Sequence, residues 1–159
     1  MSRRMDSYDD QRCARACIDG KLFSADGWGG VRVTVRLGSA RPVARFLEST
    51  GQEPLEGHLL GIEEALLMAK EMGAAKVLVF CENEAAAELA AETADVPARL
   101  LPLHFRIRAL MNQFHRAAIA PAGTISRPPG PCALGEFSAA EVRLLGRPRN
   151  LSLFPVLQA

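Results

Sequence analysis

The alternation of apolar and polar side chains predicts a group of strands in the first third of the chain. Across residues 31–37 every second side chain is valine or leucine, and arginine or threonine stands between them. A period of two is typical of a strand with one face in the core and the other in solvent. Residues 12–18 and 42–47 are predicted as further strands. The polar or glycine-rich turns between the segments favour an antiparallel, three-stranded meander.

The middle of the chain changes to a helical period. Leu59, Ile62 and Leu66 recur at the spacing of one helical face, and Gly73 is a residue type that ends helices. Residues 77–80 are an unbroken apolar run rich in strand formers, which favours a central strand covered on both faces. This part of the chain is therefore predicted as a helix followed by a buried strand.

The remaining pattern of the first 120 residues predicts two more helices and a fifth strand. The alanine-rich residues 84–94 are predicted as a helix. Pro97 is expected to start a second helix, which continues to residue 113 with a kink at Pro102. Residues 115–120 are short and apolar enough for the last strand of the sheet.

Residues 123–159 are predicted to form a proline-rich loop, a short helix and an apolar tail. Ser138 and Glu141 have the spacing of a capping box, and Gly146 is expected to end the helix that they open. The tail, residues 151–157, is apolar and is expected to pack on the domain or on a second chain. A homodimer through this tail is therefore one candidate assembly.

Composition indicates one soluble domain. The chain has 159 residues, of which 48% are hydrophobic and 23% charged, so the core is ample for a single domain. The net charge of +1 gives no overall basic field. No apolar run is long enough to span a membrane. Residues 1–11 are polar, which predicts a disordered N-terminus rather than a signal or transit peptide, and we expect a cytoplasmic protein.

The four cysteines contain no Cys-x-x-Cys pair, so no zinc site is expected. Cys13, Cys17 and Cys81 fall in predicted strands, where free buried thiols are common. This usage is typical of a reducing compartment.

The order of these elements, together with four segments, resembles the ribonuclease H family, in particular its bacterial type I, reverse-transcriptase-like branch. The segments are the Asp-Gly that ends the first strand (18–20), the glycine-containing start of the second (29–31), the central helix (59–66) and the helix-to-strand junction (73–80). The resemblance spans the domain of residues 12–122. It implies an α/β fold with a five-stranded mixed sheet, built from a three-stranded antiparallel meander and two parallel strands, with flanking helices.

The resemblance also implies a set of site residues. The family cleaves the RNA strand of RNA–DNA hybrids with two magnesium ions, which carboxylates hold because hard divalent cations need several anionic oxygens. Asp19 matches the first-strand aspartate and Glu82 the fourth-strand aspartate, so both are implied as ligands of Mg²⁺ or Mn²⁺. His58 stands where the family has the central-helix glutamate, and Glu141 matches the carboxylate that opens the last helix. Asp19, His58, Glu82 and Glu141 are thus the catalytic candidates.

Each candidate also has an ordinary structural explanation. Asp19 and Glu82 can be solvated acids at strand ends, or acids that cap the following element. His58 can be a hydrogen-bonded, semi-buried histidine, or a ligand in a mixed Asp-His-Glu site. Glu141 can simply serve its capping box.

Three functions follow from this pattern. The first is a diverged, pseudoenzyme-like protein that binds an RNA–DNA hybrid or RNA with weakened or lost cleavage, because His58 replaces a carboxylate and the family's hybrid-gripping polar residues are absent. The second is an active metal-dependent endoribonuclease with an altered Asp/His/Glu ligand set. The third is a non-enzymatic module for protein interaction or dimerisation. Arg32, Arg36 and Arg45 could contact phosphates on one face of the meander, or form a solvated sheet face.

Overall fold

A computed structural model describes residues 12–24, 27–48, 53–91 and 95–122, with the side chains of residues 21–28 excepted. The predicted disordered N-terminus (1–11) and the predicted loop, helix and tail (123–159), Glu141 among them, lie outside the described residues. The elements are β1 (Cys13–Ser24), β2 (Gly27–Leu37), β3 (Val43–Glu48), α2 (Pro54–Glu71), β4 (Lys76–Cys81), α3 (Glu84–Ala90), the 3₁₀ turn η1 (Ala98–Leu100), α4 (Leu101–Met111) and β5 (Arg116–Pro121).

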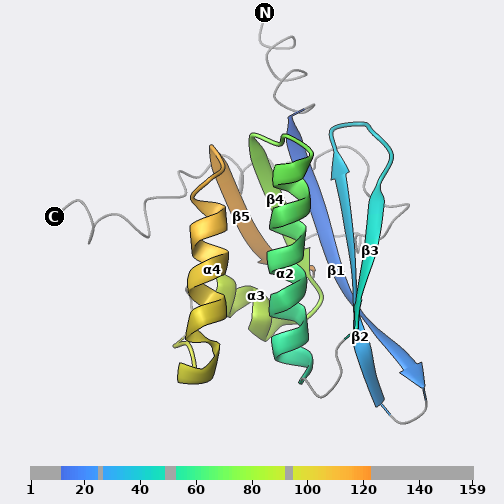
Figure 1. Ribbon diagram of the computed structural model, residues 1–159, viewed down its shortest axis with the longest axis vertical. Helices are drawn as coiled ribbons and strands as arrows, with labels where there is room; N and C mark the ends of the chain where they lie inside the picture. The colour runs from blue at the N-terminus through green and yellow to red at the C-terminus, as the bar shows by residue number, and fades with distance from the viewer. Residues whose placement is uncertain (1–11, 25–26, 49–52, 92–94, 123–159) are drawn as a thin grey trace, which may run out of the picture.

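The five strands form one mixed sheet in the order β3-β2-β1-β4-β5 (Figure 1). The pairs β1–β2 and β2–β3 are antiparallel, whereas β1–β4 and β4–β5 are parallel. Parallel strands are joined by a crossover connection that usually contains a helix, and α2 lies in the connection between the meander and β4. The predicted meander with two added parallel strands is confirmed.

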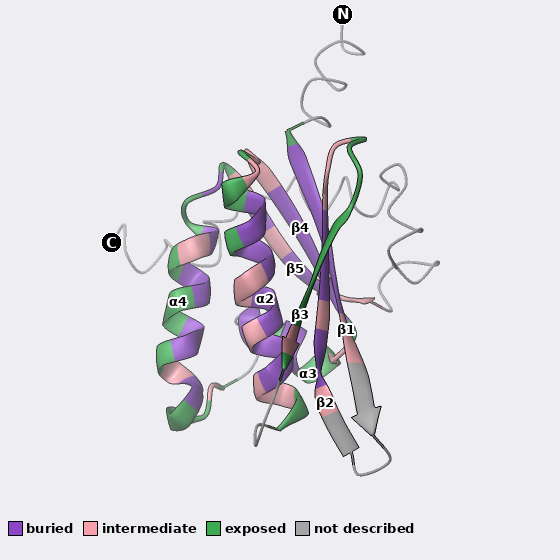
Figure 2. Ribbon diagram, turned by 45° about the vertical axis from the view of Figure 1, so that its right-hand side comes forward, coloured by how far each residue is buried: buried purple, intermediate pink, exposed green. Residues whose placement is uncertain are grey.

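The sheet buries side chains on both faces. On one face, Ala16 and Ile18 of β1 pack in a single core with Leu59, Ile62 and Leu66 of α2. On the opposite face, a second cluster joins Cys13, Leu78, Phe80 and Ala120. Figure 2 shows the resulting buried stripes along β1, β4 and the inner side of α2. Because successive strand side chains point to opposite faces, the odd-numbered β1 residues from Cys13 to Asp19 lie on the face away from α2.

α2 lies very close to the sheet at Gly61. A Cβ atom at this position would come within 2.8 Å of Cγ2 of Ile18 and 3.0 Å of Cγ2 of Val31. Distances below 3 Å are shorter than the contact of two carbon atoms allows. Gly61 is therefore the residue that lets the helix seat against β1 and β2.

The hairpin between β1 and β2 is longer than the sequence pattern predicts. The first strand was expected to end at residue 18, but β1 continues to Ser24 and pairs with β2 through two register irregularities. The sequence does not reveal this extension, because Gly20 and the glycine-rich residues 27–30 leave no regular alternation of side chains in this part of the hairpin. Gly30 has φ of 142°, and a Cβ there would lie 2.1 Å from the Leu47 carbonyl oxygen.

The helices after β4 also differ in detail from the prediction. α3 ends at Ala90 rather than near residue 94, and the second helix begins as the 3₁₀ turn η1 before α4. Pro102 lies in the first turn of α4, where the missing N–H has no helical partner in any case. The expected kink at Pro102 is therefore wrong, since this proline helps to start the helix. No helix among the described residues has the length and apolar character needed to cross a membrane.

Candidate nucleic-acid-related site

Two predicted site residues lie side by side where the pairing of β1 with β4 ends. β1 and β4 run parallel with Ile18 beside Cys81, and the amide of Glu82 donates to the Ile18 carbonyl at 3.0 Å. Asp19 and Glu82 follow directly, at the C-terminal edge where α/β sheets usually carry their ligands. The backbone therefore brings these two positions side by side.

The Asp19 carboxylate faces an arginine on the adjacent strand. Asp19 and Arg32 are opposite each other in the β1–β2 register, and a guanidinium nitrogen of Arg32 donates to Oδ2 of Asp19 at 3.0 Å. The two side chains are 22% and 31% exposed, so water screens the pair only in part. A guanidinium remains charged at any physiological pH, so Asp19 has a fixed cation beside it.

The Cys17 thiol lies under the same carboxylate. Its Sγ is 3.7 Å from Oδ1 of Asp19 and on the same face of β1. Burial first, and then the negative charge of Asp19, raise the pKa of Cys17 far above the ordinary range of a thiol. Burial likewise raises the pKa of Cys81 to about 12. The prediction that Cys13, Cys17 and Cys81 are free and buried is confirmed, and the last two are neutral, unreactive thiols at neutral pH.

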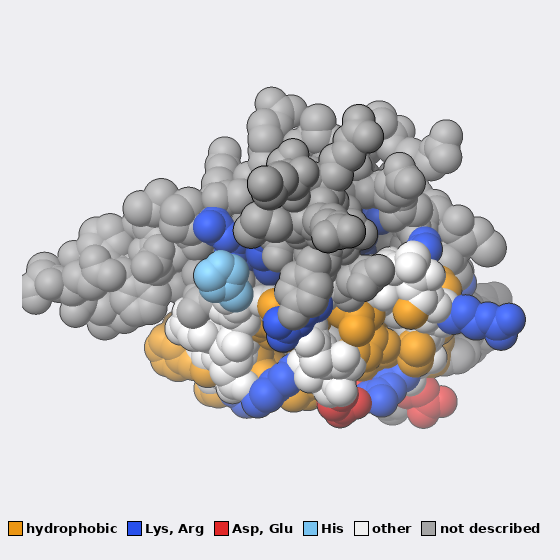
Figure 3. All heavy atoms as spheres, turned by 90° about the horizontal axis from the view of Figure 1, so that it is seen from above, with side chains coloured by type: hydrophobic (Ala, Val, Ile, Leu, Met, Phe, Trp, Pro, Cys, Tyr) orange, Lys and Arg blue, Asp and Glu red, His pale blue; other side chains and the backbone are white. Residues whose placement is uncertain are grey.

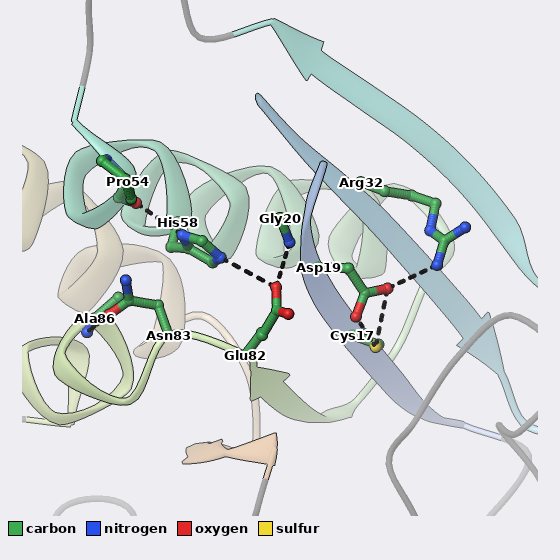
Figure 4. A network of polar contacts seen from close by, with 9 residues as sticks. All are labelled: Cys17, Asp19, Gly20, Arg32, Pro54, His58, Glu82, Asn83 and Ala86. Atoms are coloured by element: carbon green, nitrogen blue, oxygen red, sulfur yellow. Dashed lines mark hydrogen bonds and ion pairs between the residues drawn. The ribbon is translucent and has the colours of Figure 1, made fainter. Parts of the chain in front are cut away.

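The Glu82 carboxylate points to the other side of β1. Its Oε2 accepts a hydrogen bond of 2.5 Å from the Gly20 amide and lies 3.7 Å from Nε2 of His58. The Glu82 side chain is 58% exposed, whereas that of His58 is only 4% exposed. Figure 4 shows the two carboxylates directed away from each other, Asp19 toward Arg32 and Glu82 toward His58.

The His58 imidazole is anchored in the first turns of α2. Its Nδ1 lies 2.7 Å from the carbonyl oxygen of Pro54, four residues earlier. A carbonyl only accepts, so Nδ1 carries the proton and donates it. Nε2 is then the ring atom on the Glu82 side. The helix that follows Glu82, α3, is capped by Asn83, whose side-chain oxygen accepts a hydrogen bond from the Ala86 amide at 3.0 Å.

The meander arginines do not share one face of the sheet. Arg32 is opposite Asp19, on the side away from α2, whereas Arg45 pairs with two glutamates of α2, Glu64 at 2.6 Å and Glu71 at 3.3 Å. The hypothesis of a single phosphate-contacting face that includes Arg45 is therefore wrong. Sequence reasoning also missed Arg32 as the partner of Asp19. The antiparallel register of an extended β1–β2 hairpin is the signal that identifies it.

The described donors do not fit a two-metal carboxylate centre. Such a centre needs several anionic oxygens directed at the same ions. Here the Asp19 carboxylate is paired with Arg32, and the Glu82 carboxylate accepts a hydrogen bond from the Gly20 amide. Among the described side chains, no group of three His, Cys, Asp or Glu residues could hold a metal ion. Glu141 lies outside these residues, and the expected Mg²⁺ or Mn²⁺ stays a prediction.

Comparison with solved structures identifies the fold. The structure of RNase H1 from the halophilic archaeon Halobacterium salinarum NRC-1 matches with a TM-score of 0.57 and 14% identity, over 69% of this chain and 84% of that one. The N-terminal RNase H domain of a Mycobacterium tuberculosis protein, solved as a fusion with maltose-binding protein, gives 0.55 and 18%, over 69% and 85%. LC11-RNase H1 in complex with an RNA/DNA hybrid gives 0.54 and 13%, over 88% and 99%.

The likeness to these structures is one of fold. No protein-family model matches the sequence, and no curated protein matches it significantly. The five-stranded mixed sheet in the order β3-β2-β1-β4-β5, with its flanking helices, nevertheless matches the ribonuclease H fold. The chain has a ribonuclease H-like fold, as its sequence predicts.

Proposed function

We propose that this protein binds nucleic acid, an RNA–DNA hybrid or RNA, and that it cleaves weakly or not at all. The fold supports the binding part, because LC11-RNase H1, which matches in fold, is bound to an RNA/DNA hybrid. One observation carries the second part, namely the ion pair between Asp19 and Arg32.

The ion pair opposes metal-dependent hydrolysis for an electrostatic reason. Two-metal catalysis relies on cations that bind water, lower its pKa and contact both the attacking and the leaving oxygen. A guanidinium neutralises a carboxylate but has no open coordination position and cannot generate hydroxide. A divalent ion at Asp19 would also lie next to the positive charge of Arg32, which disfavours its binding.

The alternative of an active ribonuclease has its own supporting observation. His58 holds its Nδ1 proton against Pro54 and presents Nε2 3.7 Å from Glu82. An imidazole oriented by a carbonyl and next to a carboxylate can accept and release a proton. This arrangement would suit an altered Asp/His/Glu site in which Glu82 moves to a metal.

A labelled RNA–DNA hybrid, titrated with the protein in Mg²⁺, Mn²⁺ or EDTA, tests the proposal by reading binding and cleavage together. We expect binding in all three buffers, no cleavage, and unchanged affinity for Asp19→Asn. Cleavage by the wild type that Asp19→Asn abolishes would establish the ribonuclease instead. Absence of both binding and cleavage would remove nucleic acid from the proposal and favour the protein-interaction module.

Arg32→Gln is the informative companion variant. It removes the cation beside Asp19 and leaves the carboxylate in place. If the Asp19–Arg32 pair is what excludes the metal, Mn²⁺ binding measured by calorimetry should strengthen in Arg32→Gln and not in the double variant with Asp19→Asn. Equal Mn²⁺ affinity in wild type and Arg32→Gln would contradict the electrostatic reason given above.

A further inference from the structure

One end of the described core gathers six basic side chains. β1, β4 and β5 begin at this end, α2 finishes there, and the turn from β2 to β3 closes it (Figure 1). We call it the basic end, and its residues are Arg12, Arg36, Arg41, Lys70, Lys76 and Arg116, with His115 beside them. Of the described acids only Glu71 is adjacent, and its carboxylate binds Arg45. Figure 3 looks onto this end, where blue side chains are spread over the surface and red ones are confined to its lower edge.

The opposite end of the described core is acidic. It holds the ends of β1, β3 and β4, the start of α2 and the α3 region. Its acids are Asp19, Glu48, Glu53, Glu56, Glu82, Glu84, Glu88 and Asp95. The described cations nearby, Arg32 and Arg99, are ion-paired with Asp19 and Glu53. The candidate site therefore lies in a negative field.

The terminal segments do not supply a compensating negative charge. Residues 1–11 and 123–159 together contain six arginines and five acids. Their formal charge is thus slightly positive. The charges of these segments therefore do not cancel the separation of charge between the two ends of the described core, even though the whole chain has a net charge of only +1.

Two cations of the basic end are especially suited to bind an external anion. Arg41 and Lys70 are exposed, and neither side chain has a hydrogen-bond or ion-pair partner within the described parts of the chain. Arg41 lies in the turn between β2 and β3, and Lys70 in the last turn of α2. Exposed, unpaired cations bind phosphate at little desolvation cost and release condensed counterions from the nucleic acid.

We infer that the phosphate backbone of the nucleic acid contacts the basic end of the fold and not the end that carries Asp19 and Glu82. This inference rests on the proposed function and adds the surface that performs it. A polyanion is attracted to the basic end and repelled from the acidic end, and this difference directs the encounter at low ionic strength. Binding at the basic end also keeps the scissile groups away from Asp19 and Glu82, in agreement with binding without cleavage.

Paired charge-neutralising variants of the full chain test the surface. Arg41→Gln with Lys70→Gln removes two positive charges from the basic end. The matched control, Arg99→Gln with Arg106→Gln, removes two positive charges from side chains that are 52% and 55% exposed and pair with Glu53 and Glu63. Fluorescence anisotropy of a labelled RNA–DNA hybrid gives the Kd of each protein at several salt concentrations, and circular dichroism verifies the fold.

The expected result is a specific loss at the basic end. Arg41→Gln with Lys70→Gln should raise the Kd by about tenfold. It should also make the negative slope of log K against log salt shallower by about two, one for each lost phosphate contact. The control pair should change neither by more than about twofold. If both pairs weaken binding equally, the inference is wrong while the proposed function stands. If the wild type binds no hybrid, the proposed function itself fails.

Discussion

The Asp19 carboxylate and the Arg32 guanidinium lie 3.0 Å apart, and both keep part of their surface in solvent. A partly exposed pair of this kind contributes about 0.2–1 kcal/mol to folding. Its chemical effect is larger than its contribution to stability, because it fixes a positive charge where a carboxylate cluster would need a divalent ion. At this scale the candidate site is two separate polar pairs, Asp19 with Arg32 and Glu82 with His58, on opposite sides of β1.

The first pair predicts a measurable coupling. Asp19→Asn and Arg32→Gln should each lower the free energy of unfolding by about 1 kcal/mol or less, and the double variant should cost less than the sum, by about 0.5–1 kcal/mol. Urea unfolding at low salt measures this coupling energy. The coupling should shrink in 1 M salt, because the Debye length of about 3 Å is then no longer than the distance between the two charges. Asp19→Asn combined with Arg106→Gln is the control and should be additive. Additive costs for Asp19 and Arg32 would show that the pair is not formed in solution.

Part of this site follows from sequence and part does not. Parallel strands end at the same edge, so the buried run before Glu82 and the strand before Asp19 predict that the two acids are neighbours. Which way each side chain points depends on the β1–β2 register and on strand alternation. That register is set by pairing through Gly20 and the glycine-rich segment that follows, which carries no side-chain pattern to read.

At the scale of elements, predictions that rest on side-chain burial are correct, whereas those that depend on backbone hydrogen bonding are not. Residues 31–37 and 77–80 were predicted correctly because burial of one or both strand faces imposes a pattern on side chains. The extension of β1 to Ser24 leaves no such pattern, and the sequence alone does not place Pro102 in the first turn of its helix rather than in the interior, where it would produce a kink. Element boundaries depend on backbone hydrogen bonds, which side-chain periodicity reports poorly.

The seat of α2 on the sheet predicts the effect of Gly61→Ala. Alanine favours helix over glycine by about 1 kcal/mol, but its Cβ would meet methyl groups of Ile18 and Val31 at 2.8 and 3.0 Å. β-branched side chains in a packed core cannot rotate away from the added methyl group. We expect a net loss of about 1–3 kcal/mol in the free energy of unfolding, measured by urea or thermal unfolding.

A variant on the outer side of the same helix is the control for Gly61→Ala. Leu67 is 37% exposed, so Leu67→Ala removes few core contacts and should cost about 0.5 kcal/mol or less. A Gly61→Ala protein that is more stable than the wild type would mean that helix propensity outweighs the clash. In that case α2 would lie farther from β1 and β2 than these distances indicate.

At the scale of the whole molecule, net charge conceals the distribution of charge. A value of +1 over 159 residues suggests an electrostatically neutral protein, yet six described cations gather at one end of the sheet and eight described acids at the other. The separation is readable only after the topology is known, because the relevant residues are scattered from Arg12 to Arg116 in the sequence. Parallel strands then align their starts, and with them Lys76 and Arg116, which are direct neighbours in the β4–β5 register.

Such a bipolar molecule with almost no net charge should attract copies of itself, the basic end of one toward the acidic end of the next. Near neutral pH the net repulsion that keeps proteins apart is minimal, while the ends remain within reach of each other when the Debye length is about 30 Å, at 0.01 M salt. Static light scattering at pH 7 should therefore give attractive interactions at low salt that weaken progressively by 0.2 M salt. Arg41→Gln with Lys70→Gln should reduce the attraction even though it leaves the net charge equally small, at −1 instead of +1. Attraction that increases with salt would instead indicate hydrophobic contacts, and charge separation would not then govern how these molecules meet.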